Sequence, residues 1–226
     1  KILDDSCKLT NFGNTLVEFP LIPSLARILI AGGEYGCGEE ILTIVAMLTV
    51  PSIWVTPKEF RSTADKARMG FAVTEGDMLT LLNVYNQFQK AKSKVEWCKR
   101  HFIHHKILYK AEDVRKQLYK YARRFKVPIK SSSDTVAIRK AIICGLFANG
   151  AQMQPDGSYK TIRGGHTLHL HPSSVLFKYP PPWVIFYEVI RTTKEYMRDV
   201  TAVEPEWLGQ LAPHFYDYKK RKEVIL

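Results

Sequence analysis

Hydrophobic and polar positions follow two different periods in the two parts of the chain. Up to residue 146, apolar residues recur at every third or fourth position, which places them on one face of an α-helix. Beyond it, short apolar and alternating runs are separated by Asp156-Gly157 and Gly164-Gly165, pairs that favour tight turns between strands. The pattern therefore predicts an α+β chain in which a helical bundle precedes a β-domain.

The helical part contains eight expected helices. They cover residues 13–19, 24–31, 36–50, 63–71, 77–88, 95–104 and 108–125, with a last one that ends at residue 146. Asn11, Asp77 and Asp134 stand where an N-cap side chain would accept backbone N–H groups. The helix over residues 36–50 is apolar nearly all round, so we expect it to be the buried centre of the bundle. Residues 2–10 are predicted to form two short strands joined by a turn.

The second part contains five expected strands and a closing helix. The strands cover residues 148–153, 158–162, 167–171, 183–191 and 197–203, and the helix covers residues 204–211. Five short strands with a closing helix fit a small barrel, most simply an OB-fold. Pro172 lacks an N–H and should end the third strand, after which the hydroxyls of Ser173 and Ser174 can order the loop backbone.

The positive charge of the chain is concentrated in one segment. The net charge is +11, and residues 88–130 carry fourteen Lys and Arg against three acids, so this segment alone accounts for the excess. Lys116, Lys120 and either Arg123 or Arg124 recur at the spacing that puts them on one helical face. A surface that faces a polyanion would have this distribution, and so would a solvated helical face rich in lysine.

The cysteines and the apolar runs bear on the cellular setting. Cys7, Cys37, Cys98 and Cys144 are scattered through apolar or helical contexts, which favours reduced, buried thiols in an intracellular protein. No apolar run reaches the roughly 18–20 residues that a membrane span needs, so we expect no membrane partner. The chain has no initiator Met and begins inside an expected strand, so we take it as a piece of a longer protein.

Several residue groups invite a catalytic, phosphate-binding or metal-binding interpretation. Residues 32–38 are rich in glycine, but a P-loop requires Lys and Ser or Thr where Glu39 and Glu40 follow, so a connection between helices explains them better. His166, His169 and His171 could bind a metal, although a third ligand is not evident and an exposed strand also accommodates histidines. No nucleophile, base and orienting group come together in the sequence.

Aromatic residues interleave with the basic segments and extend into the barrel. They are Tyr85, Trp97, Tyr109, Tyr119, Tyr121, Tyr187 and Tyr196. Stacking platforms combined with cationic grooves are typical of proteins that bind single-stranded nucleic acid. Aromatic residues also fill cores, and for Trp97 and Trp207 we favour a place in the core.

Several blocks in order along the chain resemble one known family. They lie at residues 9–13, 19–21, 39–48, 76–85, 97–98, 102, 114–118, 171–176, 192–201 and 207–213, and include Gly76-Asp77 and His171-Pro172-Ser173-Ser174-Val175-Leu176. Together they resemble the C-terminal region of DEAH-box RNA helicases, and within that family the members associated with the spliceosome. The family usually has His after Gly-Asp, where this chain has Met78, so a polar contact of that histidine must be absent or replaced here.

The resemblance implies a division of the chain and a set of partners. Residues 1–33 would end a winged-helix unit, residues 34–133 would form the helical ratchet domain, residues 134–218 the OB-fold domain, and residues 219–226 a basic tail. In the family, two upstream RecA-like motor domains use ATP and Mg, and RNA runs between them and this C-terminal lid. The chain has no Walker motif and no Asp-Glu-Ala-His, so it is expected to be a non-catalytic accessory module that needs no cofactor of its own.

The expected role is to enclose single-stranded RNA during unwinding or remodelling in pre-mRNA splicing, in the nucleus. Expected partners are the RNA, the motor domains, and G-patch or other spliceosomal proteins. The candidate RNA contacts are Asp77, Thr80 and Asn83 at a helix start, Lys116, Lys120 and Arg123 on the basic helix, and His171, Ser173, Lys194 and Arg198 around the barrel. The alternative is a protein-interaction platform that docks acidic or G-patch-type partners.

Overall fold

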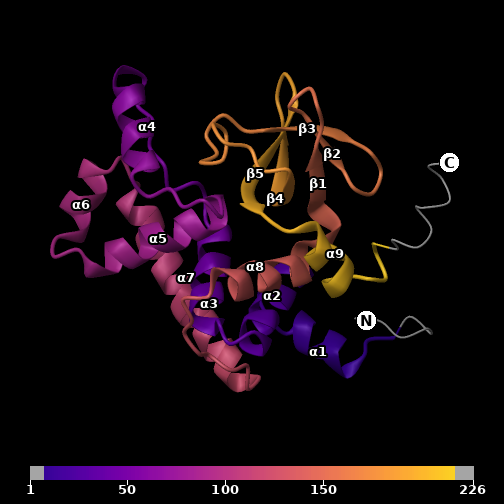
Figure 1. The fold of residues 1–226 in the computed structure, drawn as a ribbon. Coiled ribbons are helices and arrows are strands. Elements are labelled where there is room, and N and C mark those ends of the chain that lie inside the picture. Colours follow the sequence, from indigo (N-terminus) through magenta and orange to yellow (C-terminus); the bar gives the residue numbers. More distant parts are fainter. Residues whose placement is uncertain (1–7, 217–226) are drawn as a thin grey trace.

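The chain folds into a helical part and a barrel that pack side by side (Figure 1). The structure is a computed structural model that describes residues 8–216. The helical part contains α1 (Asn11–Val17), α2 (Pro23–Glu34), α3 (Gly38–Leu48), α4 (Arg61–Met69), α5 (Asp77–Lys90), α6 (Lys94–Arg100), α7 (His105–Arg124) and α8 (Thr135–Leu146). Short 3₁₀ turns, η1 (Lys58–Phe60) and η2 (Phe147–Asn149), precede α4 and the barrel.

The barrel is closed and five-stranded, as the alternating pattern predicts. Its strands are β1 (Gly150–Met153), β2 (Tyr159–Thr161), β3 (Thr167–Leu170), β4 (Trp183–Arg191) and β5 (Glu195–Ala202), followed by α9 (Pro205–Leu211). The order around the barrel is β1-β2-β3-β5-β4, with β4 returning to β1. β3 and β5 pair in parallel, and the other neighbours are antiparallel. The predicted α+β class with a helical bundle before an OB-fold barrel is confirmed.

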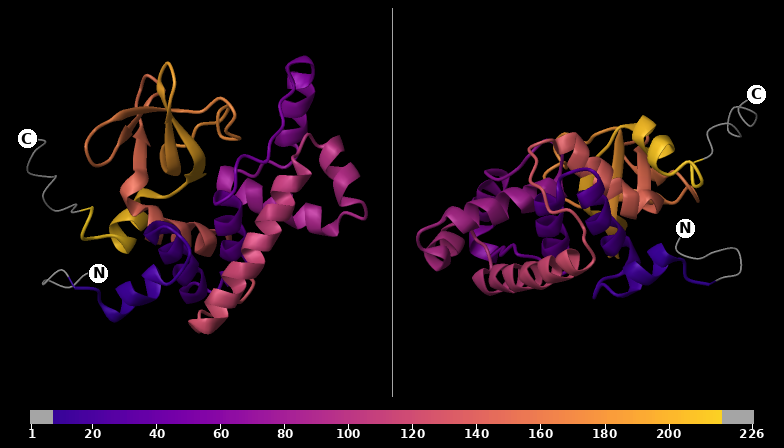
Figure 2. Two further views of the ribbon diagram at one scale, coloured as in Figure 1. Left: turned by 180° about the vertical axis from the view of Figure 1, so that it is seen from behind. Right: turned by 90° about the horizontal axis from the view of Figure 1, so that it is seen from below.

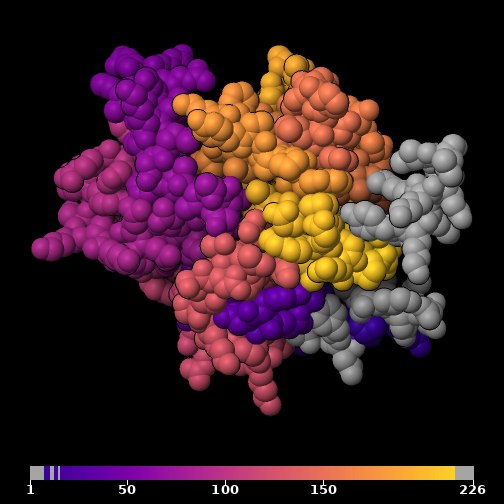
Figure 3. All heavy atoms as spheres, viewed as in Figure 1, coloured from indigo at the N-terminus to yellow at the C-terminus, as the bar shows by residue number. Residues whose placement is uncertain are grey.

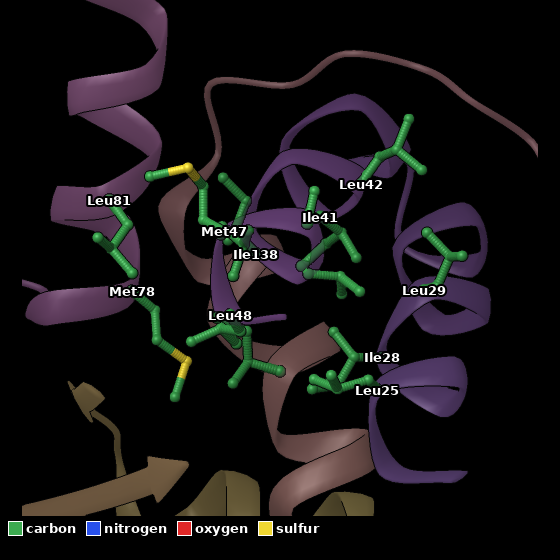
Figure 4. Close-up of a cluster of buried hydrophobic side chains, with 14 of the residues drawn as sticks. Leu25, Ile28, Leu29, Ile41, Leu42, Met47, Leu48, Met78, Leu81 and Ile138 are labelled. Atoms are coloured by element: carbon green, nitrogen blue, oxygen red, sulfur yellow. The ribbon is translucent and has the colours of Figure 1, made fainter. Parts of the chain in front are cut away.

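The buried centre of the helical part is α3, as its apolar composition predicts. Figure 4 shows Met47 of α3 between two groups of side chains, with Met78 and Leu81 of α5 on one side and Leu25 and Leu29 of α2 on the other. Met78 is fully buried in this core. The polar contact that a histidine could make at this position is therefore replaced by apolar packing.

The barrel and the helical part share one hydrophobic core. Ile185 of β4 and Leu208 of α9 belong to the same buried cluster as α2, α3 and α8, while a second cluster fills the barrel interior. Figure 2 shows α8 and α9 at the base of the barrel, and Figure 3 shows the two parts forming a continuous surface. Because apolar area is buried across the boundary, the two parts stabilise each other.

The caps and ends of several elements differ from the predictions. Asn11 was predicted to cap the first helix, but Thr10 does so: its Oγ1 accepts the N–H of Gly13 at 3.0 Å, and the helix starts two residues earlier. The predicted cap at Asp134 is confirmed, since its carboxylate accepts the N–H groups of Val136 and Ala137. Residues 2–7 of the predicted N-terminal strands and the basic tail lie outside the described residues.

The glycine-rich segment at residues 32–38 contains the end of α2, the connection at residues 35–37 and the first residue of α3, in agreement with the helix-connection interpretation. The predicted end of α2 at residue 31 is wrong, because the helix continues to Glu34. A Cβ at Gly32 would lie 2.7 Å from the Cβ of Ile41, so this glycine lets the two helices approach each other closely.

Two thiols are buried and unpaired, as expected for Cys37 and Cys98. Burial raises the pKa of Cys37 to about 12 and that of Cys98 to about 11, so both thiols stay protonated. Cys144 is partly buried and free. Among the helices of the described part, none is long and apolar enough to span a membrane.

Candidate nucleic-acid interface

Asp77 ties the helical part to the barrel. The prediction that it caps α5 is wrong, because Gly76 occupies the N-cap position and makes no side-chain cap. The Asp77 carboxylate turns toward the barrel and accepts hydrogen bonds from Ser174 Oγ at 2.8 Å, the Val175 N–H at 2.9 Å and the Val200 N–H at 3.0 Å. Burial raises the pKa of Asp77, although these hydrogen bonds and Arg68 act in the opposite direction.

Gly76 brings α5 directly against β5. It has a φ of 117° and forms an isolated bridge with Thr201. A Cβ at this position would clash with the carbonyl oxygen of Val200, so only glycine fits. The Gly76-Asp77 pair therefore fixes the junction through both its backbone and its side chain.

The loop after β3 is ordered by its own polar side chains, as the sequence predicts. The Nδ1 atom of His171 lies 2.7 Å from Ser173 Oγ and accepts the Ser173 N–H at 3.2 Å. Ser174 is buried, and its hydroxyl also accepts the N–H of Leu176. Burial, with Arg198 and Arg68 nearby, lowers the pKa of His171, which favours the neutral ring that these bonds require.

Arg68 of α4 is a site residue that the sequence did not single out. Its side chain is buried, its Nη1 donates to the carbonyl oxygen of Ser173 at 2.9 Å, and its guanidinium lies 4.6 Å from the ring centroid of Trp54. It thus links α4 to the loop after β3. In the sequence, Arg68 is visible only as one of two cations, with Lys66, in a short expected helix. Its partner Ser173 lies far along the chain, so no local pattern indicates the contact.

Two hollows flank Arg68 where the helical part meets the barrel. A small cavity of about 50 Å³ is lined by five predicted site residues, Asp77, Thr80, His171, Ser173 and Arg198, together with Arg68 and Asp199. A larger groove of about 690 Å³ runs between α4 and the segment that follows β3. Its charged lining comprises Arg61, Lys66, Arg68 and Lys178 against the single acid Asp65. We call this larger hollow the junction groove.

The junction groove also has an apolar side. Met69 and Phe177 line it, and Phe177 is 50% exposed although it is a large hydrophobic residue. Figures 1 and 3 show α4 rising beside the barrel. The residues that line the groove come from α4 and from the segment after β3. The arrangement offers cations and an exposed aromatic ring together, which suits a strand of nucleic acid.

Thr80, Asn83 and Lys194 do not line the junction groove. Thr80 is buried and bonded to the Gly76 carbonyl oxygen and the Val73 N–H, and the Asn83 amide donates to the carbonyl oxygen of Phe71. Lys194 is exposed between β4 and β5. These contacts give Thr80 and Asn83 a structural role in the start of α5.

The basic residues of α7 form a separate surface. Lys116, Lys120 and Arg123 are exposed, and Lys116 lies 3.7 Å from both Glu112 and Asp113. Figures 1 and 2 show α7 apart from the barrel in each view. The ten predicted residues therefore do not form one continuous site.

Two further carboxylates, those of Asp199 and Glu188, lie at or beside the small cavity. Asp199 in β5 has a φ of 51°, and burial together with the Asp77 carboxylate raises the pKa of Asp199 to about 7. Glu188 of β4 pairs with Arg198 at 3.2 Å. Within the described residues, no group of three or more His, Cys, Asp or Glu side chains is placed to hold a metal ion, and His166, His169 and His171 form none.

Comparisons with known proteins agree on the two domains. The helicase associated domain (HA2), ratchet-like, matches residues 23–81, and the oligonucleotide/oligosaccharide-binding (OB)-fold matches residues 138–216. The chain is 48% identical over 217 residues to "Probable ATP-dependent RNA helicase DHX35" of Homo sapiens and of Pongo abelii. These alignments cover 95% of this chain but only 31% and 30% of those proteins, so the chain spans about a third of the length of its curated relatives.

Proposed function

The chain belongs to the DEAH-box RNA helicases, as part of their C-terminal region, and from this premise we propose that it binds single-stranded RNA in the junction groove. The observation that supports this most is the composition of the groove, with four cationic side chains against one acid. The helicase-associated domain supplies Arg61, Lys66 and Arg68, and the OB-fold supplies Phe177 and Lys178.

The proposed contacts follow from the exposure of each side chain. Arg61, Lys66 and Lys178 are exposed and reach phosphates, whereas Phe177 offers a ring for base stacking. Arg68, His171 and Ser173 hold the groove wall through the bonds described above. Asp77, Thr80 and Asn83 position α5 and the loop, and Arg198, which pairs with Glu188, lies in the adjoining small cavity outside the groove.

We propose Lys116, Lys120, Arg123 and Lys194 as weaker, outlying contacts. They are exposed and cationic, but they lie outside the residues that line the groove. The exposed rings of Tyr109 and Tyr119 on α7 give the same surface some of the character of a protein interface. That observation favours the second candidate, a platform on α7 that docks acidic or G-patch-type partners. Charge reversal at Lys116 and Lys120 would abolish partner capture and leave RNA binding intact if the second candidate holds.

The activity of the whole protein is part of the same proposal. The named relatives are probable ATP-dependent RNA helicases, so we propose that upstream motor domains bind ATP and Mg and that this module encloses RNA as they act. A role in pre-mRNA splicing, a nuclear location, and G-patch or spliceosomal partners rest on the resemblance to spliceosome-associated members. We also propose the division at residues 33, 133 and 218 as the working domain boundaries.

Salt dependence tests RNA binding directly. Fluorescence anisotropy of a labelled 12-nucleotide oligouridine would be followed with the 226-residue chain between 50 and 200 mM salt. Three phosphate contacts predict a slope of about −2 in log affinity against log salt, so affinity should fall roughly fifteenfold. Binding that is absent, or that barely changes with salt, would refute the proposal.

A further inference from the structure

A second cavity lies beside the small one and is distinct from the junction groove. It has a volume of about 200 Å³. Apolar walls come from Met47, Leu48, Trp54 and Leu81. The charged lining comes from the barrel, with the acids Glu188 on β4 and Asp199 on β5 and the single cation Arg198 on β5. Pro51, Ser52 and Glu188 also line it and are exposed, so the cavity opens to the surface. We call it the acidic socket.

Asp199 is the unusual group in the acidic socket. The carboxylate of Asp77 has three donors, and Glu188 has Arg198. In the part of the chain that the structure describes, the Asp199 carboxylate makes no hydrogen bond and no ion pair within 4 Å. Asp199 is partly buried and lines the acidic socket, so its carboxylate is accessible to a side chain that enters there.

The backbone also places Asp199 in a restricted conformation. Its φ of 51° lies in the left-handed region, where aspartate and asparagine are tolerated better than most residues. The neighbouring Arg198 and Val200 keep the register of β5, with Arg198 opposite Glu188 and Val200 opposite Phe186. The distortion is thus confined to Asp199, whose side chain lines both cavities.

We propose that the acidic socket receives one basic side chain, a lysine or an arginine, from a protein partner. The methylene stem would lie along Met47, Leu48 and Leu81, and the cationic head would pair with Asp199, the arrangement that long basic side chains adopt at apolar surfaces with a polar end. The volume suits a single side chain, since it is below the roughly 300–1,000 Å³ of pockets that bind small molecules.

The local charges favour a cation over a phosphate. Three carboxylates, Asp77, Glu188 and Asp199, lie near two guanidinium groups, Arg68 and Arg198. With Asp199 ionised, one further positive charge neutralises the cluster, and an RNA phosphate would be repelled. The proposal goes beyond RNA binding, because the acidic socket and the junction groove share no acidic residue and can be altered separately.

Binding of a cation should depend on pH in a defined direction. The charged groups that face Asp199 are Asp77 on α5, Arg68 on α4, Glu188 on β4 and Arg198 on β5, and the phenol of Tyr187 on β4 also faces it. Burial raises the pKa of Asp199 to about 7, so its carboxylate is mostly protonated at pH 6 and mostly ionised at pH 8. A cation pairs only with the ionised form, so its affinity should rise by roughly tenfold from pH 6 to pH 8.

The experiment uses a minimal probe for the partner side chain. N-acetyl-arginine methylamide, with the lysine analogue as a second cation, is titrated into the 226-residue chain at pH 6 and pH 8 while the Trp54 indole signal and the Tyr187 amide signal are followed by NMR. N-acetyl-citrulline methylamide is the neutral control of the same shape. We expect saturable shifts with a cationic probe, no saturable shifts with citrulline, and tighter binding at pH 8.

Matched variants decide whether Asp199 is responsible. Asp199→Asn keeps a residue suited to the left-handed backbone and should weaken binding about tenfold at pH 8 and remove its pH dependence. Glu195→Gln removes a carboxylate from the same strand, where it pairs with Arg191 at 2.8 Å, and should bind as the native chain does. Binding of the oligouridine by Asp199→Asn reports folding and keeps this test separate from RNA binding.

The proposal is overturned if citrulline binds as well as arginine, if Asp199→Asn binds as the native chain does, or if the oligouridine displaces the cationic probe. The last result would assign the acidic socket to RNA.

Discussion

The carboxylate of Asp77, the first residue of α5, accepts a hydrogen bond at 2.8 Å from the hydroxyl of Ser174, which lies 97 residues further along the chain. The same carboxylate accepts two backbone N–H groups, those of Val175 and Val200. One side chain of the helical part therefore holds two separate segments of the barrel and fixes the wall of the proposed RNA groove.

Removal of this carboxylate should destabilise the whole chain. Asp77→Ala leaves three donors without an acceptor, and an unsatisfied buried donor costs about 1–3 kcal/mol, so we expect a loss of about 3 kcal/mol in the free energy of unfolding. Asp77→Asn should lose less, because an amide oxygen still accepts. Chemical denaturation followed by circular dichroism measures both. The matched control is Asp113→Ala on the exposed face of α7, which should change the free energy of unfolding by less than about 0.5 kcal/mol. If Asp77→Ala is as stable as this control, the role given to Asp77 is wrong.

Arg68 should contribute through its planar group as well as its charge. Arg68→Met removes the donor to Ser173 and the cation over Trp54, and we expect it to cost about 2 kcal/mol of stability. Arg68→Lys keeps the charge but not the fork geometry and should cost about half as much. Lys66→Met, on the same helix but exposed, is the control and should stay within about 0.5 kcal/mol. If denaturation curves of Arg68→Met and Lys66→Met coincide, the linking role of Arg68 is wrong.

Asp199 should make the stability of the chain depend on pH. Its pKa is raised from 3.8 to about 7 in the folded state, so between these values the folded chain binds a proton more tightly than the unfolded chain. The stability that this proton provides is complete below pH 4 and is lost as the pH rises to about 7. Asp199→Asn lacks this loss. Between pH 4 and pH 8 its free energy of unfolding should therefore rise by about 1–3 kcal/mol relative to that of the native chain. Thermal unfolding of both chains at pH 4 and pH 8 measures this difference in stability. A difference that is the same at both pH values would disprove the role given to Asp199.

Much of the fold follows from local patterns in the sequence. The apolar helix at residues 38–48 is buried because nearly every side chain on it is apolar, and Asp134 caps α8 because its carboxylate reaches N–H groups only two and three residues away. The barrel follows in the same way from short strands separated by glycine turns. Such features depend on neighbours within a few residues, which a sequence pattern contains.

The site depends on distant neighbours and was predicted less well. An aspartate at the start of a helix has the same local sequence whether it caps that helix or accepts bonds from another domain, so Asp77 was assigned the wrong partner. Arg68 was missed because its partner Ser173 lies 105 residues away. The charge count located the basic segment along the chain but not in space, where α7 lies apart from the barrel.

The central claim is that RNA lies in the junction groove and not on α7. The most direct measurement compares oligouridine affinity and its salt dependence for two double variants that remove equal charge, Lys66→Gln with Lys178→Gln in the groove, and Lys116→Gln with Lys120→Gln on α7. The groove variant should lose roughly tenfold in affinity, and its salt slope should become shallower by about 1.4, since each phosphate contact contributes about 0.7. The α7 variant should stay within about threefold of the native chain. Loss of affinity in the α7 variant with native binding by the groove variant would contradict the account.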